Sequence, residues 1–117
     1  MPDLTFGDLN DALEETAFSV SGSELTIDLN LLMGESSISL SDQKVAEFLT
    51  NLLDVASAAQ EAYNANNANT TKLASYPQPV SGIPFVDVAS GNFFVSSTYS
   101  FSSQAPLNKA ATTAVTA

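Results

Sequence analysis

Histidine, cysteine, tryptophan and arginine are all missing from this chain of 117 residues. Without cysteine or histidine the chain has no thiolate nucleophile, no imidazole acid–base group and no thiolate or imidazole ligand for a metal ion. Without arginine it has no guanidinium group to clamp a phosphate. Because most familiar catalytic centres need one of these groups, we expect a protein that is not an enzyme and that binds no cofactor.

Basic residues are nearly as scarce, with 3 against 13 acidic residues and a formal net charge of −10. Charged residues make up only 14% of the chain, against about 25% in an average domain, so the chain is poor in bases rather than rich in acids. Its field repels phosphate backbones and anionic membrane surfaces. We therefore expect no nucleic-acid partner.

Long apolar runs are absent as well. No stretch approaches the ~20 apolar residues of a membrane span, and the first ten residues lack the basic start and apolar run of a secretory signal. The sequence therefore predicts a soluble protein without membrane insertion. It names no compartment, and a virion or another extracellular assembly stays open.

The clearest periodic segment is a helix predicted from residue 42 to about residue 64. Its apolar residues fall within an arc of roughly 160° on a helix of 3.6 residues per turn. Ser41 or Asp42 is expected to cap its first turn. The apolar residues are Val45, Phe48, Leu49, Leu52, Leu53, Val55, Ala56 and Ala59.

Strands are predicted on both sides of this helix. Residues 24–32 alternate apolar and polar side chains, with Leu25, Ile27, Leu29 and Leu31 on the apolar side. A turn at residues 21–23 should link this strand to the preceding one as a hairpin. The remaining expected elements are a short helix near residues 8–15 and strands at residues 17–20, 37–41, 83–88 and 92–101.

Together these segments predict an α+β fold in which an antiparallel sheet packs against one long amphipathic helix. The alternative is a β-sandwich with a peripheral helix. We expect a single globular domain over residues 1–103, with a long polar loop at residues 64–82, followed by an extended C-terminal arm at residues 104–117.

Few motifs could carry chemistry. Ser41 and Lys44 form a Ser-x-x-Lys pattern, the spacing of a serine nucleophile with its lysine base, but the companion motifs of that site are missing. Asp8 begins a segment like a calcium loop that lacks the required glycine. Asp87 interrupts an apolar run and is interpreted as an edge or turn residue. We interpret Ser41 as a helix cap and the carboxylates as solvent-exposed groups.

The leading functional hypothesis is a non-catalytic structural subunit of a larger assembly, such as a virion, phage-tail or filament component. Its partners would be copies of itself or other protein subunits. The proposed interface residues are Leu107 and Val115 in the C-terminal arm, and Phe94 and Tyr99 in the last strand. The alternative is a small acidic module or inhibitor that recognises a basic partner. An enzyme that uses carboxylates or the Ser41 and Lys44 pair ranks third.

Overall fold

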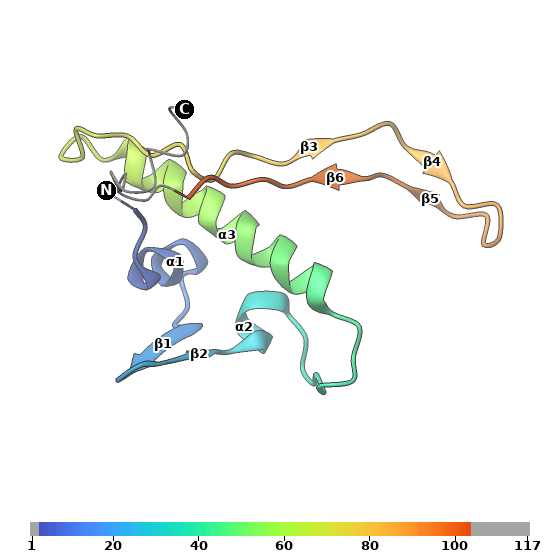
Figure 1. Ribbon diagram of the computed structural model, residues 1–117, viewed down its shortest axis with the longest axis horizontal. Helices are drawn as coiled ribbons and strands as arrows, with labels where there is room; N and C mark the ends of the chain where they lie inside the picture. The colour runs from blue at the N-terminus through green and yellow to red at the C-terminus, as the bar shows by residue number, and fades with distance from the viewer. Residues whose placement is uncertain (1–2, 104–117) are drawn as a thin grey trace, which may run out of the picture.

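The chain forms a helical body from which a long two-stranded β ribbon projects (Figure 1). The computed structural model describes residues 3–103. The predicted C-terminal arm lies outside the described residues, and so do its two proposed contact residues, Leu107 and Val115. In chain order the elements are α1 (Phe6–Leu13), β1 (Phe18–Ser21), β2 (Glu24–Ile27), α2 (Leu29–Met33), α3 (Val45–Ala65), β3 (Val80–Ser81), β4 (Phe85–Val86), β5 (Phe93–Phe94) and β6 (Ser97–Thr98).

The structure confirms the predicted α+β class, because it combines antiparallel strand pairs with one long helix. Within residues 3–103 the strands form three two-stranded sheets, β1–β2, β3–β6 and β4–β5. Helix α3 packs against α1 and α2, and the β1–β2 hairpin contacts α1. The antiparallel pairing is therefore divided between the body and the ribbon.

Helix α1 begins where Thr5 and Asp8 form a capping box. The Thr5 hydroxyl accepts from the Asp8 backbone N–H at 3.1 Å, and the Asp8 carboxylate accepts from the Thr5 backbone N–H at 2.8 Å. This cap starts the helix at Phe6, two residues before the predicted start. Asp8 is thus the cap partner of Thr5 within a helix, not the first ligand of a calcium loop.

The β1–β2 hairpin is confirmed, with Ser21 opposite Glu24 across a two-residue turn. Gly22 adopts a φ of +60° there, which other residues rarely tolerate. Asn10 of α1 binds the other end of β1 with both halves of its side-chain amide. Its nitrogen donates to the Phe18 carbonyl at 2.9 Å, and its oxygen accepts from the Phe18 N–H at 2.8 Å. One α1 side chain therefore replaces a neighbouring strand.

The predicted strand at residues 24–32 is wrong beyond Ile27. Asp28 caps α2 instead, because its carboxylate accepts from the backbone N–H groups of Asn30 at 3.1 Å and Leu31 at 3.4 Å. The α2 helix buries Leu32, whereas Leu25 of β2 is 44% exposed. The alternating pattern therefore does not mark one buried strand face.

The strand expected at residues 37–41 is also wrong. This segment is a loop, in which the Asp42 carboxylate accepts from the backbone N–H and the hydroxyl of Ser39 at 3.0 and 3.2 Å. Helix α3 starts after it, at Val45, and its N-cap residue is Lys44, which makes no side-chain capping bond. Ser41 and Asp42, the expected caps, lie before the N-cap position at Lys44 and do not cap the helix.

The core lies where α1, β1 and α2 meet the middle of α3. Two alanines of α3, Ala56 and Ala59, are buried in it and let the other elements approach closely. Phe48, Leu52 and Val55 are half-buried against the same cluster. The buried members are Leu9, Ala17, Phe18, Leu32, Ala56 and Ala59. The short elements cover only part of the apolar arc of α3, and Leu49 stays exposed.

After α3 the chain returns along the helix, held by two more side-chain amides. Asn64 pairs with the backbone of Leu73 at 2.9 and 2.8 Å. Gln60 pairs with the backbone of Tyr76 at 3.1 and 3.0 Å. This segment brings the chain to the base of the ribbon beside α3.

Candidate functional site

The first candidate site is the β ribbon, which we define as residues 80–98. Strands β3 and β6 pair Val80 with Thr98, and strands β4 and β5 pair Phe85 with Phe94. Between the two pairs one strand carries one residue more than the other, a β-bulge at residues 82–84. The ribbon projects from the helical body (Figure 1), and the radius of gyration of 18.2 Å exceeds the roughly 13 Å of a compact domain of about this length.

The bulge follows from its residues. Gly82 donates its N–H to the Ser96 carbonyl at 2.6 Å, and a Cβ on Gly82 would lie 3.3 Å from that oxygen. Pro84 has no N–H to offer to the opposite strand. A glycine that allows close approach and a proline that cannot pair thus interrupt the ladder at this point.

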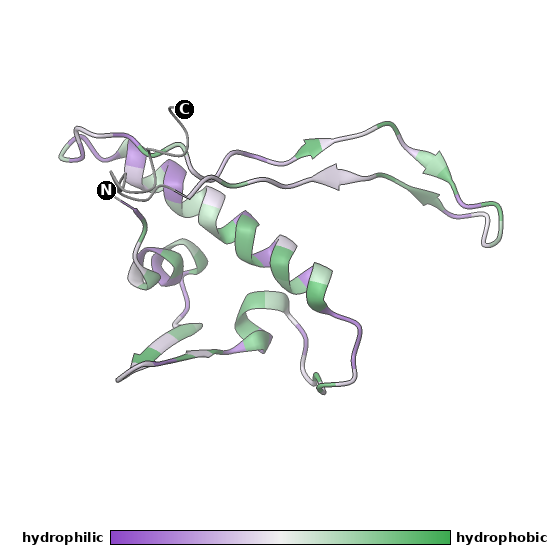
Figure 2. Cartoon of the chain, in the orientation of Figure 1, coloured by the Kyte–Doolittle hydropathy of each residue, from purple (hydrophilic) through white to green (hydrophobic). Residues whose placement is uncertain are grey.

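The ribbon exposes large apolar side chains along its length, and β3, β4 and β5 have the colour of hydrophobic residues in Figure 2. Phe93 is 80% exposed and Val88 is 93% exposed. Phe85 and Phe94 lie opposite one another with ring centroids 6.1 Å apart, which leaves about half of each ring accessible. The exposed apolar residues are Val80, Ile83, Phe85, Val86, Val88, Phe93, Phe94 and Val95.

The ribbon carries a single charged residue, Asp87, and this residue closes its terminal turn. The Asp87 carboxylate accepts from the Ser90 hydroxyl at 2.7 Å, and its carbonyl accepts from the Gly91 N–H at 2.7 Å. Gly91 has a φ of +73°. Asp87 therefore has the turn role expected from the sequence, and the ribbon surface is otherwise uncharged.

The direction of the ribbon is fixed by hydrogen bonds at its base. The Tyr99 hydroxyl donates to the Asp54 carboxylate of α3 at 3.3 Å, and the Ser102 N–H donates to the Ser75 carbonyl at 2.9 Å. Partial burial and the bond to Asp54 raise the pKa of Tyr99 above its ordinary value. Of the two expected interface residues in this region, Phe94 lies on the exposed ribbon and Tyr99 attaches the base of the ribbon to the body.

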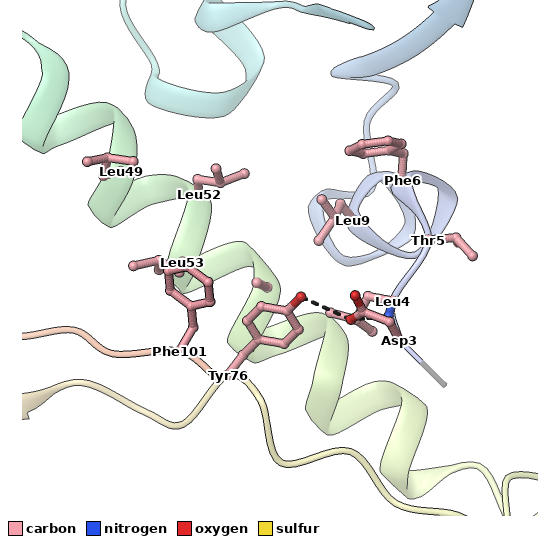
Figure 3. A pocket seen from close by; sticks show the side chains of 11 residues that line it. Asp3, Leu4, Thr5, Phe6, Leu9, Leu49, Leu52, Leu53, Tyr76 and Phe101 are labelled. Atoms are coloured by element: carbon pink, nitrogen blue, oxygen red, sulfur yellow. Dashed lines mark hydrogen bonds between the residues drawn. The ribbon is translucent and has the colours of Figure 1, made fainter. Parts of the chain in front are cut away.

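The second candidate site is an apolar groove of about 610 Å³ between α1, α3 and the ribbon base. Leu49 and Leu53 of α3 line one side, and Phe101 of the ribbon base turns toward them (Figure 3). Leu4, Phe6 and Leu9 line the α1 side. The groove forms where the apolar arc of α3 is wider than the elements that cover it.

One polar contact closes an end of this groove. The Tyr76 hydroxyl donates to the Asp3 carboxylate at 3.0 Å (Figure 3). Partial burial, followed by the bond to Asp3, raises the pKa of Tyr76 above its ordinary value. Of the described residues that line the groove, Asp3 alone is charged.

Ser41 and Lys44 each contact other side chains. The Ser41 hydroxyl lies 2.9 Å from the Ser39 hydroxyl. The Lys44 ammonium contacts the carboxylates of Glu35 at 3.2 Å and Glu47 at 3.1 Å. Hydrogen bonds to Glu47 and Glu35 raise the pKa of Lys44, which keeps the amine protonated and unable to accept the serine proton.

Five of the carboxylates have structural partners. Asp8, Asp28 and Asp42 bind backbone N–H groups, Asp54 accepts from Tyr99, and Asp87 closes a turn. Within residues 3–103, no group of three or more acidic, histidine or cysteine residues is placed to hold a metal ion. In the same part of the chain, no helix is long and apolar enough to cross a membrane.

Comparison of the chain with protein-family models, with curated protein sequences and with solved structures found no significant match.

The exposure of the ribbon was missed by the sequence analysis, although a signal for it was present. Apolar residues occupy neighbouring positions in the ribbon, as in Phe85 and Val86 or Phe93 and Phe94. Both faces of such strands are apolar. Within residues 3–103, helix α3 packs its buried side against α1 and α2, and apolar residues on the ribbon stay exposed.

Proposed function

We propose that this protein is a structural subunit of a multi-subunit assembly and that its β ribbon is the surface that binds a neighbouring protein. The observation that carries the proposal is the ribbon itself, two consecutive pairs of short strands with eight exposed large apolar residues. An isolated two-stranded ribbon is only marginally stable in water. Contiguous exposed apolar surface of this kind marks an interaction site.

Burial of the exposed phenylalanine side chains of the ribbon would contribute a substantial part of the free energy of association. The rings of Phe85, Phe93 and Phe94 are 52%, 80% and 47% exposed. Full burial of a phenylalanine covers roughly 150–250 Å², so the three rings present on the order of 350 Å². At about 25 cal/mol per Å², covering them contributes roughly 9 kcal/mol. Association costs about 4–15 kcal/mol, so one ribbon supports a weak contact and several ribbons support a stable assembly.

The distribution of charge also supports a neutral interface. Of the 13 acidic residues, 12 lie in residues 3–61 and only Asp87 lies in the ribbon. Copies of such a chain repel one another through their acidic bodies, whereas their nearly uncharged ribbons can approach with little repulsion. The lack of histidine, cysteine and arginine in the sequence is consistent with a non-enzymatic role.

The test is light scattering on the full chain after size exclusion. We expect particles larger than the 12.2 kDa monomer, and we expect Phe93→Ser to shift them toward the monomer. Leu40→Ser is the matched control, because Leu40 is also fully exposed but lies outside the ribbon. A wild-type chain that stays monomeric at all concentrations, or equal assembly of both variants, would contradict the proposal.

The salt dependence of binding distinguishes this function from the alternative, an acidic module that binds a basic partner. The Debye screening length falls to about 3 Å at 1 M salt, which weakens ionic contacts. Apolar contacts persist or strengthen in excluded salts such as sulfate. We expect the assembly to survive 1 M sodium sulfate.

A further inference from the structure

Among residues 3–103, two apolar surfaces are left without a partner, the tip of the ribbon and the groove between α1 and α3. The tip comprises Phe85, Val86, Val88, Phe93 and Phe94 around the turn at residues 87–91. We infer that the tip of one copy docks in the groove of a second copy. This inference rests on the proposed function and specifies its partner.

A chain cannot fill its own groove with its own tip. Phe101, which follows the ribbon, already lines the groove, so the groove lies at the ribbon base. A strand rises about 3.3 Å per residue, which places the turn at residues 87–91 on the order of 30 Å beyond Val80. Figure 1 shows the tip at the end remote from α1. Folding back would break the β3–β6 and β4–β5 pairs.

The groove is large enough for the side chains of the tip. An apolar cavity of about 150 Å³ can hold one benzene ring, and the groove measures about 610 Å³. Its walls are the leucines of α3 and the apolar residues of α1, with Phe101 at one side. Aromatic rings such as those of Phe93 and Phe94 would replace water against these walls.

Charge favours a copy of this chain as the occupant. Among the described lining residues the groove has one carboxylate, Asp3, which accepts from Tyr76, and the ribbon has one, Asp87, which accepts from Ser90. Each carboxylate is bonded to a neutral hydroxyl and the described residues of tip and groove are otherwise uncharged, so these are the surfaces at which two copies repel one another least. The remaining body surface carries 11 acidic residues besides Asp3 and disfavours contact between copies elsewhere.

Such a contact joins two different surfaces, so it is heterologous. Each copy offers a tip to one neighbour and a groove to another. Repetition produces a closed ring or an open filament, depending on the rotation between successive copies. A symmetric dimer that joins two tips would instead leave both grooves empty.

The chain is well suited to a cross-linking test because it contains no cysteine. The variant Ala89→Cys places a thiol in the exposed turn of the tip, and Leu49→Cys places one at an exposed position of the groove. Phe101→Cys is a second exposed groove position, in case Leu49→Cys alters the fold. Ser23→Cys, in the exposed β1–β2 turn, is the control site outside both surfaces.

Two single-cysteine chains of different mass are mixed, oxidised mildly and analysed by mass spectrometry. A docked tip holds the two thiols at an effective concentration on the order of millimolar. At micromolar protein we therefore expect Ala89→Cys to cross-link to the groove variants more than about tenfold over its cross-linking to Ser23→Cys.

The other outcomes overturn the inference in different ways. Cross-links mainly between two Ala89→Cys chains would show tip-to-tip contact, and equal yields at groove and control positions would show no docking in the groove. Either result, with a wild-type assembly sensitive to Phe93→Ser, overturns the groove as partner and leaves the proposed function standing. A monomeric wild-type chain overturns both.

Discussion

Replacement of Asn10 by alanine tests how this small body is held together. The Asn10 amide makes two hydrogen bonds to the backbone of Phe18, at 2.9 and 2.8 Å. Phe18 is only 3% exposed, so water cannot readily replace the lost partners. A buried backbone group left unsatisfied costs about 1–3 kcal/mol. Two such groups outweigh the gain of up to about 0.7 kcal/mol from the better helix propensity of alanine.

We therefore expect Asn10→Ala to lower the free energy of unfolding by about 2–4 kcal/mol. For a domain of this size, a loss of 2 kcal/mol lowers the Tm by roughly 8–16 °C. Urea unfolding followed by circular dichroism measures the effect as a fall in midpoint at constant m value.

The matched control is Asn30→Ala in α2, where the asparagine side chain is exposed. This variant should change the free energy of unfolding by less than about 0.5 kcal/mol. If Asn10→Ala were as stable as the control, the amide of Asn10 would not substitute for a neighbouring strand, and the reasoning would be refuted.

Three further predictions concern individual residues. Leu32→Ala should lower the free energy of unfolding in urea by about 2–5 kcal/mol, because Leu32 is buried in the core. Leu25→Ala, at a half-exposed strand position, should lower it by less than about 1 kcal/mol. Equal losses would contradict the burial of Leu32 by helix α2. Ser41→Ala should cost less than about 0.5 kcal/mol, because Ser41 caps no helix; a loss above about 1 kcal/mol would restore the cap. The raised pKa of Tyr76 reflects a proton held in the folded state by burial and the bond to Asp3. Its contribution to stability is complete below the ordinary pKa of 10.0 and is lost as the pH rises through the folded-state pKa. Thermal melts should show a smaller fall in Tm above pH 10 for Tyr76→Phe than for the wild type, and identical falls would contradict this assignment.

The long helix and the first hairpin could be predicted from the sequence because each depends on a local signal. The apolar spacing of α3 has a helical period over many turns. The hairpin turn needs a positive φ at one residue, and Gly22 supplies it. Both signals lie within the segments they determine, so they can be read without tertiary information.

Helix α2 could not be distinguished from a strand by alternation alone. Leu29 and Leu31 continue the period of two, whereas Leu29 and Leu32 have the i, i+3 spacing of one helix face, and so short a segment allows either reading. The outcome depends on Asp28, whose carboxylate binds two backbone N–H groups when the helix forms. The cap favours a helix over a longer strand at this point, and burial of Leu32 against α3 stabilises the helix further.

The candidate sites were predicted less well because they depend on surfaces that stay uncovered. Phe94 lies on the exposed ribbon, and its expected place at an interface stays a prediction. The groove could not be predicted, because it is the remainder of the α3 apolar arc after α1 and α2 have packed. Such a remainder depends on tertiary packing rather than on the pattern of one helix.

Hydrogen exchange of the ribbon amides, followed by mass spectrometry at low and high protein concentration, tests most directly whether the ribbon is covered by a neighbour. The strands of the ribbon are two residues long and exposed, so their amides should exchange rapidly in a dilute monomer. We predict strong protection of residues 80–98 at concentrations where the chain assembles, with unchanged exchange in the β1–β2 hairpin. Equal exchange of the ribbon at both concentrations, in a sample shown by light scattering to be assembled, would contradict the account.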